Sequence, residues 1–156
     1  LYHHFLFPNE IRAFEPYTYN PDINGKFVVR TMQGSDPDIE AGYIWTHFAL
    51  RTYDYLEDGE VHLYGEFNNF VLDETTQMTY NPETAAYENA RLFKQGYYDY
   101  KYVFLRNDGI LDEGFISGNF ISTENDYTVL SDYLPPGGSY TRINGVGNAS
   151  SINIAK

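Results

Sequence analysis

The segment 41–53, AGYIWTHFALRTY, alternates between two sets of side chains with a period of two. That period is typical of a strand with one buried face, because an amphipathic helix repeats about every 3.6 residues. One set points toward a core, with Thr46 as its polar member. The expected inward set is Ile44, Thr46, Phe48 and Leu50, and the outward set is Tyr43, Trp45, His47 and Ala49. The segment therefore predicts a sheet packed on one face.

Short strand-like segments recur along the chain, separated by turns rich in Gly, Pro, Asn and Asp. The 16 Tyr and 11 Phe favour strands, because bulky rings suit a pleated surface. No long helical period separates the segments, so we expect an all-β, immunoglobulin-like antiparallel sandwich; without Cys it has no disulfide. The expected strands are 2–7, 26–33, 41–53, 60–66, 76–80, 87–93, 97–105, 110–117 and 126–133, the last two forming a pair.

We expect three regions along the chain. Residues 1–38 are predicted to be an N-terminal extension, the remainder of a preceding region, because the chain opens directly on the strand pattern LYHHFLF. Residues 39–133 form the predicted β-sandwich domain. Residues 134–156 are turn-rich and are predicted to be a surface tail.

The charge balance argues against two classes of partner. Asp and Glu number 22 against 10 Lys and Arg, giving a formal net charge of -12, which repels phosphate backbones and anionic lipids. No apolar run approaches the roughly 20 residues of a membrane-spanning helix. We therefore expect neither nucleic-acid binding nor membrane insertion.

The sequence contains no motif that indicates catalysis or a cofactor. Nucleophile elbows, phosphate-binding Gly loops and His-Glu-x-x-His are missing. Asp36, Asp38 and Glu40 have the spacing of calcium ligands, but the Gly and Glu that a calcium loop needs further on are absent. His3 and His4 would point to opposite faces of a strand and so cannot share a metal. We expect a non-enzymatic protein with no cofactor.

The segment 61–70, VHLYGEFNNF, carries the best candidate binding residues. Its strand pattern, 60–66, places Val61, Leu63 and Gly65 on a buried face and His62, Tyr64 and Glu66 on a solvated face. Beyond it, Asn68 and Asn69 suit a turn, and Phe70 emerges where the chain reverses. A ring beside amide groups fits a saccharide face, but it equally fits a tight turn.

Residues 61–109 resemble the glycogen-binding and starch-binding modules found in branching enzymes and in the β subunit of AMP-activated kinase. The matching elements are VHLYGEFNNF, residues 78–82, Leu92, Gly96, YDYKYVF and the turn at 107–109. The resemblance implies an early-set immunoglobulin-like domain. Lys101 matches a sugar-contacting Lys, whereas Phe70 stands where those modules carry a stacking Trp, and Ile110 and Leu111 stand where a second Trp lies.

A longer resemblance covers nearly the whole chain. The segments YHHFLFPNEI, PDINGKFVVR, AGYIWTHFAL, GNFISTENDYTVL and PPGGSYTRINGVG resemble the C-terminal half of the type IX secretion system plug protein of Bacteroidetes. One departure is Ser131, Asp132 and Tyr133, where that pattern has a more apolar strand end.

The plug resemblance implies a periplasmic, non-catalytic binding domain in protein transport, whose partner is the outer-membrane translocon that it occludes. The alternative is a carbohydrate-binding module for an α-glucan, or weak glycan binding beside the plug role. The candidate binding residues for either are Asn68, Asn69, Phe70, Tyr80 and Lys101.

Overall fold

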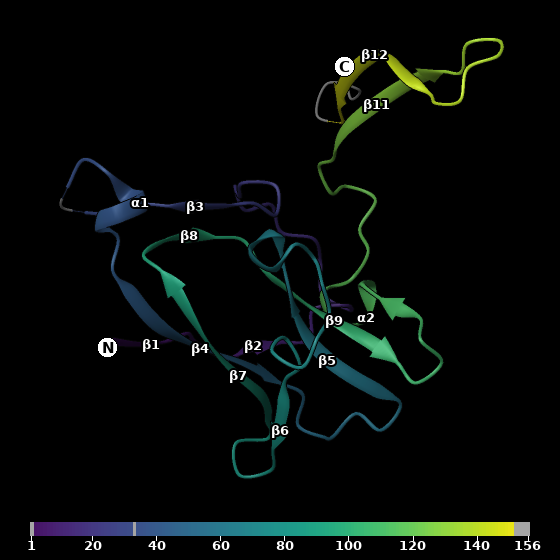
Figure 1. Ribbon diagram of the computed structural model, residues 1–156. Coiled ribbons are helices and arrows are strands. Elements are labelled where there is room, and N and C mark those ends of the chain that lie inside the picture. The colour runs from purple at the N-terminus through teal and green to yellow at the C-terminus, as the bar shows by residue number, and fades with distance from the viewer. Residues whose placement is uncertain (1, 33, 152–156) are drawn as a thin grey trace. The chain divides into compact units, whose positions relative to one another are not determined.

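The structure, a computed structural model, describes residues 2–32 and 34–151 (Figure 1). The chain divides into two compact units, Leu1–Phe120 and Ile121–Lys156. The division falls after Phe120, whereas the sequence predicted boundaries at 38/39 and 133/134. Strands from the expected extension pair with strands of the first unit.

The larger sheet of the first unit has five strands in the order β1-β4-β7-β6, with β2 also paired to β4. β6 and β7 are antiparallel to their neighbours, but β1 and β2 both run parallel to β4. The strands are β1 (Tyr2–Phe5), β2 (Asn9–Glu10), β4 (Tyr43–Arg51), β6 (Thr79–Asn81) and β7 (Ala86–Lys94).

The second sheet has three antiparallel strands in the order β10-β9-β5, and a small sheet pairs β3 with β8. The expectation of an all-β, immunoglobulin-like sandwich is confirmed. These strands are β3 (Phe27–Val29), β5 (Gly59–Tyr64), β8 (Gly96–Tyr98), β9 (Lys101–Arg106) and β10 (Leu111–Asp112).

The core lies between the two larger sheets and follows the predicted alternation. Thr46, Phe48 and Leu50 of β4 are buried, as are Val61 and Leu63 of β5. These side chains are largely apolar and almost completely removed from water, so their burial is the main favourable term for this unit. The rest of the core cluster is Met78, Tyr87, Tyr102, Phe104 and Ile116.

The expected strand 110–117 is mostly wrong. Only Leu111–Asp112 is a strand, and it pairs with β9. The Asp112 carboxylate accepts hydrogen bonds from the backbone N–H groups of Gly114 and Phe115, which starts the short helix α2 (Gly114–Ser117). This turn of helix carries Ile116, which is buried in the core.

The second unit is built on the antiparallel pair β11 (Asp126–Tyr133) and β12 (Arg142–Ser150). The prediction that 126–133 pairs with 110–117 is therefore wrong, and Arg142–Ser150 of the expected surface tail is a mostly exposed strand. The register shifts between Ser131 and Asp132, at the point where the sequence departs from the plug pattern. A bulge of this kind accommodates an irregular strand end.

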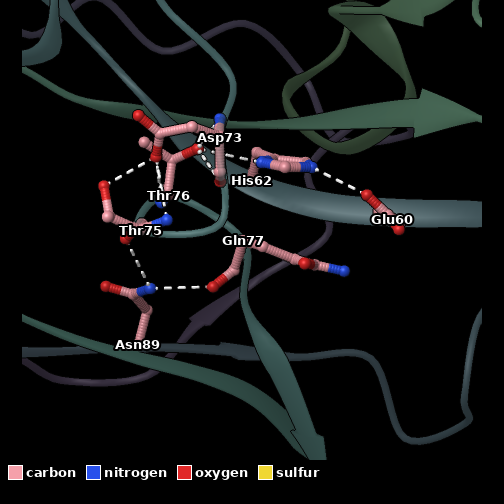
Figure 2. Close-up of polar contacts among 7 residues, drawn as sticks. All are labelled: Glu60, His62, Asp73, Thr75, Thr76, Gln77 and Asn89. Carbon is pink, nitrogen blue, oxygen red and sulfur yellow. Dashed lines mark hydrogen bonds and ion pairs between the residues drawn. The ribbon is translucent and has the colours of Figure 1, made fainter.

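His62 is 3% exposed, although the strand pattern placed it on a solvated face. Figure 2 shows that the loop carrying Asp73, Thr75 and Thr76 lies over this face of β5. Thr76 is itself fully buried there. The loop therefore shields this face of β5 from solvent.

Two further short helices complete the described elements, α1 (Pro37–Glu40) and η1 (Glu66–Asn68). In α1 the Asp36 side chain accepts from the backbone N–H of Asp38, and Glu40 accepts from the N–H groups of Ser35 and Asp36. Two of the three carboxylates with calcium-like spacing thus hold the local backbone. No helix among the described residues is long and apolar enough to cross a membrane.

Candidate functional site

The turn after β5 holds Phe70 in an unusual backbone conformation. Asn69 and Phe70 have φ of 53° and 57°, in the left-handed region. Asn tolerates this region, but a bulky aromatic residue there is an outlier. Such strain persists only where the surroundings impose it, and it concentrates at functional sites. Phe70 is therefore the feature of this turn that most merits a functional explanation.

Asn68 is occupied by the fold of the turn. Its Oδ1 accepts from the backbone N–H of Gly65 at 3.3 Å, and its Nδ2 donates to the carbonyl of Val71 at 2.8 Å. The turn also needs Gly65, because a Cβ there would lie 2.5 Å from the Phe67 ring. Asn68 thus acts as a turn residue, as its sequence context allowed.

Phe70 joins a small exposed patch that spans the turn and the three-stranded sheet. Its ring is 47% exposed and lies 5.2 Å from the Tyr64 ring, tilted by 56°. Tyr64 is paired in register with Lys101 of β9, whose Nζ lies 5.6 Å from the Tyr64 ring centre. Lys101 also forms an ion pair with Glu113. We call Tyr64, Phe70, Lys101 and Glu113 the Tyr64 patch.

The electrostatics of the Tyr64 patch keep its phenol neutral. Burial raises the pKa of the Tyr64 hydroxyl, and the negative charge of Glu113 raises this pKa further. The patch therefore presents a neutral O–H, an ammonium group and a carboxylate beside two rings. This set can hydrogen-bond a polyol and contact its apolar face.

Tyr80 belongs to a different set of contacts. It lies on β6, where its hydroxyl donates to the carbonyl of Tyr53 at 3.0 Å. Its ring packs 5.2 Å from Tyr87 and 5.7 Å from Tyr55. The structure thus places Phe70 and Lys101 beside Tyr64, and it places Tyr80 beside Tyr55 and Tyr87.

Two members of the Tyr64 patch escaped the sequence prediction. The sequence pattern placed Tyr64 on a solvated face, but it did not predict that Tyr64 lies opposite Lys101, because this depends on the register of β5 and β9. Glu113 reaches Lys101 because β10 turns back along β9. Strand register was the missing information in both cases.

The pair β11–β12 exposes apolar side chains on both of its faces. Leu130 is 59% and Val146 65% exposed, and the two residues are paired across the strands. Tyr127 and Val129 alternate with Leu130 and so lie on the opposite face. All eight residues of β11 are exposed. A two-stranded sheet with two uncovered apolar faces is marginally stable by itself.

No group of three or more metal-ligating side chains gathers among residues 2–32 and 34–151. The expectation of a non-catalytic binding protein stays a prediction.

The chain is similar to a solved structure. The solved structure of a hypothetical protein from Parabacteroides merdae matches this chain with a TM-score of 0.87 and 40% sequence identity. The match covers 96% of this chain and 38% of that protein. No protein-family model matches the chain, and no match was found among curated proteins. The chain thus shares its fold with a stretch of a protein more than twice its length.

Proposed function

We propose that this chain is a non-catalytic binding domain of a periplasmic plug protein that occludes the type IX secretion translocon of the outer membrane. The proposal rests first on the resemblance of five segments, spread from residue 2 to residue 147, to the C-terminal half of that plug family. The similarity to a longer protein from Parabacteroides merdae, a Bacteroidetes species, agrees with this family distribution.

The observation that carries the proposal is the uncovered apolar surface of β11–β12. Tyr127, Val129, Leu130 and Val146 are all at least half exposed. Apolar and aromatic side chains of this kind form the centres of protein interfaces, and patches of them mark interaction sites. The long unpaired edges of the two strands add backbone groups that can pair with a partner.

Co-purification of the translocon with the full-length plug from cells tests this proposal. Two double variants address the two faces, Leu130→Lys with Val146→Lys and Tyr127→Lys with Val129→Lys. The matched control is Ile110→Lys, which changes a residue that is 58% exposed in the first unit. At least one double variant should lose most of the recovered translocon, while the control keeps it.

Recovery that is unchanged in both double variants contradicts the proposal. Far-ultraviolet circular dichroism and a thermal melt of each purified variant separate loss of the interface from loss of the fold. A variant that melts like the wild type but fails to recover the translocon supports a direct contact.

A second candidate function is an α-glucan-binding module, and the Tyr64 patch is the observation that favours it. Phe70 and Lys101, two of the residues expected to contact sugar, both lie beside the Tyr64 ring. The two rings are tilted and not coplanar, so they offer no single flat stacking surface. Lys101 is also paired with Glu113. Both features weaken the patch as a sugar platform.

Calorimetric titration with maltoheptaose and a cyclic maltooligosaccharide decides between the two candidates. The glucan candidate predicts millimolar or tighter binding that Phe70→Ala and Lys101→Ala abolish and Tyr80→Phe leaves intact. Absence of binding to the wild-type protein removes this candidate and leaves the plug proposal unaffected.

A further inference from the structure

Two histidines from segments far apart in the sequence meet on the outer face of the larger sheet. β1 and β4 run parallel, with His3 opposite Trp45 and Phe5 opposite His47. His3 and His47 therefore share one face, and Nδ1 of His3 lies 2.9 Å from Nε2 of His47. His4 points to the opposite face. The sequence analysis tested only His3 and His4 as a metal-binding pair. It could not include His47, because the pairing of β1 with β4 is not evident from the sequence.

Neighbouring rings hold the pair in place. Phe5 stacks on His47 with ring centres 4.1 Å apart and an interplanar angle of 14°. His3 lies 5.2 Å from His47, centre to centre, at 29°. A hydrogen bond between two imidazole nitrogens needs one N–H and one lone pair, so at least one ring is neutral and one proton lies between them.

We propose that His3 and His47 bind a divalent transition-metal ion of the nickel, copper and zinc group. Two metal–nitrogen bonds of about 2.0 Å at right angles separate the nitrogens by about 2.8–2.9 Å, and a tetrahedral angle separates them by about 3.3–3.4 Å. The observed 2.9 Å is the length of the hydrogen bond, and it places the two nitrogens close enough for a rotation of the rings to bring both to one ion.

Metal entry exchanges one set of bonds for another. The proton between the rings passes to solvent, water leaves the ion, and each nitrogen donates its lone pair to the metal. The rings need to turn so that both lone pairs face the ion. His3 is exposed and has room for this rotation.

The site is open and exchangeable. No third His, Cys, Asp or Glu joins the pair within the part of the chain that the structure describes, so water fills the remaining positions. The affinity of the site should be highest for Cu²⁺ and lower for both Ni²⁺ and Zn²⁺. Because the ligands come from β1 and β4, the ion stabilises the attachment of the N-terminal edge strand.

Trp45 provides a reporter inside the sheet. It is the single Trp of the chain, it is opposite His3 in register, and it lies on the same face of β4 as His47. Bound Cu²⁺ or Ni²⁺ should quench its fluorescence. The titration uses tag-free, N-terminally acetylated protein and the metal chlorides alone, because a free amino group near His3 would itself chelate Cu²⁺.

We expect saturable quenching by Cu²⁺ that is at least tenfold weaker in His3→Ala and in His47→Ala. His4→Ala is the matched control, since it removes the adjacent imidazole on the other face, and it should titrate like the wild type. Zn²⁺ should raise the melting temperature of the wild type and His4→Ala and leave that of His47→Ala unchanged.

Equal metal affinity in His47→Ala and His4→Ala overturns the proposal, as does wild-type protein that binds none of the three ions. A His47→Ala variant that fails to fold leaves His3→Ala against His4→Ala as the deciding comparison.

Discussion

His62 and Thr76 form a buried polar pair, with Nδ1 of His62 2.9 Å from Oγ1 of Thr76 (Figure 2). Nε2 of His62 lies 3.2 Å from the Glu60 carboxylate, which only accepts hydrogen bonds, so Nε2 carries the proton. Oγ1 of Thr76 also donates to the carbonyl of Asp73 at 2.9 Å and accepts from the backbone N–H of Asp73 at 3.0 Å. This pair joins the loop at 73–77 to the three-stranded sheet.

Replacing Thr76 with Val should destabilise the fold through this pair. The substitution keeps the shape of the side chain but leaves the buried Nδ1 of His62 without its hydrogen-bond partner, at a cost of about 1–3 kcal/mol. Urea unfolding followed by Trp45 fluorescence measures the change in unfolding free energy. Thr79→Val, at an exposed position on β6, is the control and should change it by less than about 0.5 kcal/mol. Equal stability of the two variants would contradict this role of Thr76.

Asp73 should make stability depend on pH at the acid end. Its carboxylate accepts from the Thr75 hydroxyl and the N–H groups of Thr75 and Thr76, which holds the pKa of Asp73 below its usual value. Folding therefore favours the charged form. The stabilisation is complete above the unfolded pKa, about 3.9, and is lost as pH falls through the lower folded pKa.

Urea midpoints of the wild type and Asp73→Asn test this linkage. The wild type should be more stable at pH 7, and the difference should shrink as pH falls below about 4. A difference that is constant from pH 7 to pH 2.5 would show that the Asp73 charge has no part in it.

Position 70 should accept Gly with a smaller loss of stability than Ala. An L-residue in the left-handed region costs about 1–2 kcal/mol, and Gly does not pay this cost. Because Gly also has greater freedom when unfolded, Phe70→Gly should exceed Phe70→Ala in unfolding free energy by about 0.5–1 kcal/mol. Chemical denaturation of the two variants measures the difference. Greater stability of Phe70→Ala would mean that the turn does not hold position 70 at positive φ.

Tyr102 should contribute stability that disappears in alkali. Its hydroxyl donates to Asn9 Oδ1 at 3.2 Å, and burial raises the pKa of the Tyr102 hydroxyl well above its usual value. The folded state thus favours the neutral phenol, so this stability is complete below the unfolded pKa of about 10 and falls as pH rises beyond it.

Tyr102→Phe should lower the unfolding free energy near pH 7 by about 1 kcal/mol, the net value of one hydrogen bond. Its deficit relative to the wild type should shrink above pH 10. A deficit that grows with pH would contradict the direction of the pKa shift.

The strands that could be predicted are those with a clear period of two. In β4, Phe48 and Leu50 alternate with small or polar neighbours, and this signal depends only on local sequence. β12 was missed because Gly145 and Gly147 give the segment the composition of a turn, and its pairing with β11 supplies the strand. The parallel pairing of β1 with β4 is also invisible to local pattern.

The candidate site divides in the same way. Asn68 and Asn69 indicate a turn, so the exposure of the following residue, Phe70, was predictable. The contacts of Lys101 with Tyr64 and Glu113, and of His3 with His47, join separate strands. Such contacts require the register, which one sequence does not contain.

Site-specific photo-crosslinking in living cells tests the central claim most directly. A photoreactive amino acid is placed at Leu130 on one face of β11–β12, at Val129 on the other, and at Ile110 in the first unit as control. If this chain docks on the secretion translocon through β11–β12, Leu130 or Val129 gives a covalent adduct with the translocon barrel and Ile110 gives none. Adducts absent from both strand positions, in protein that is expressed and folded, would contradict the account.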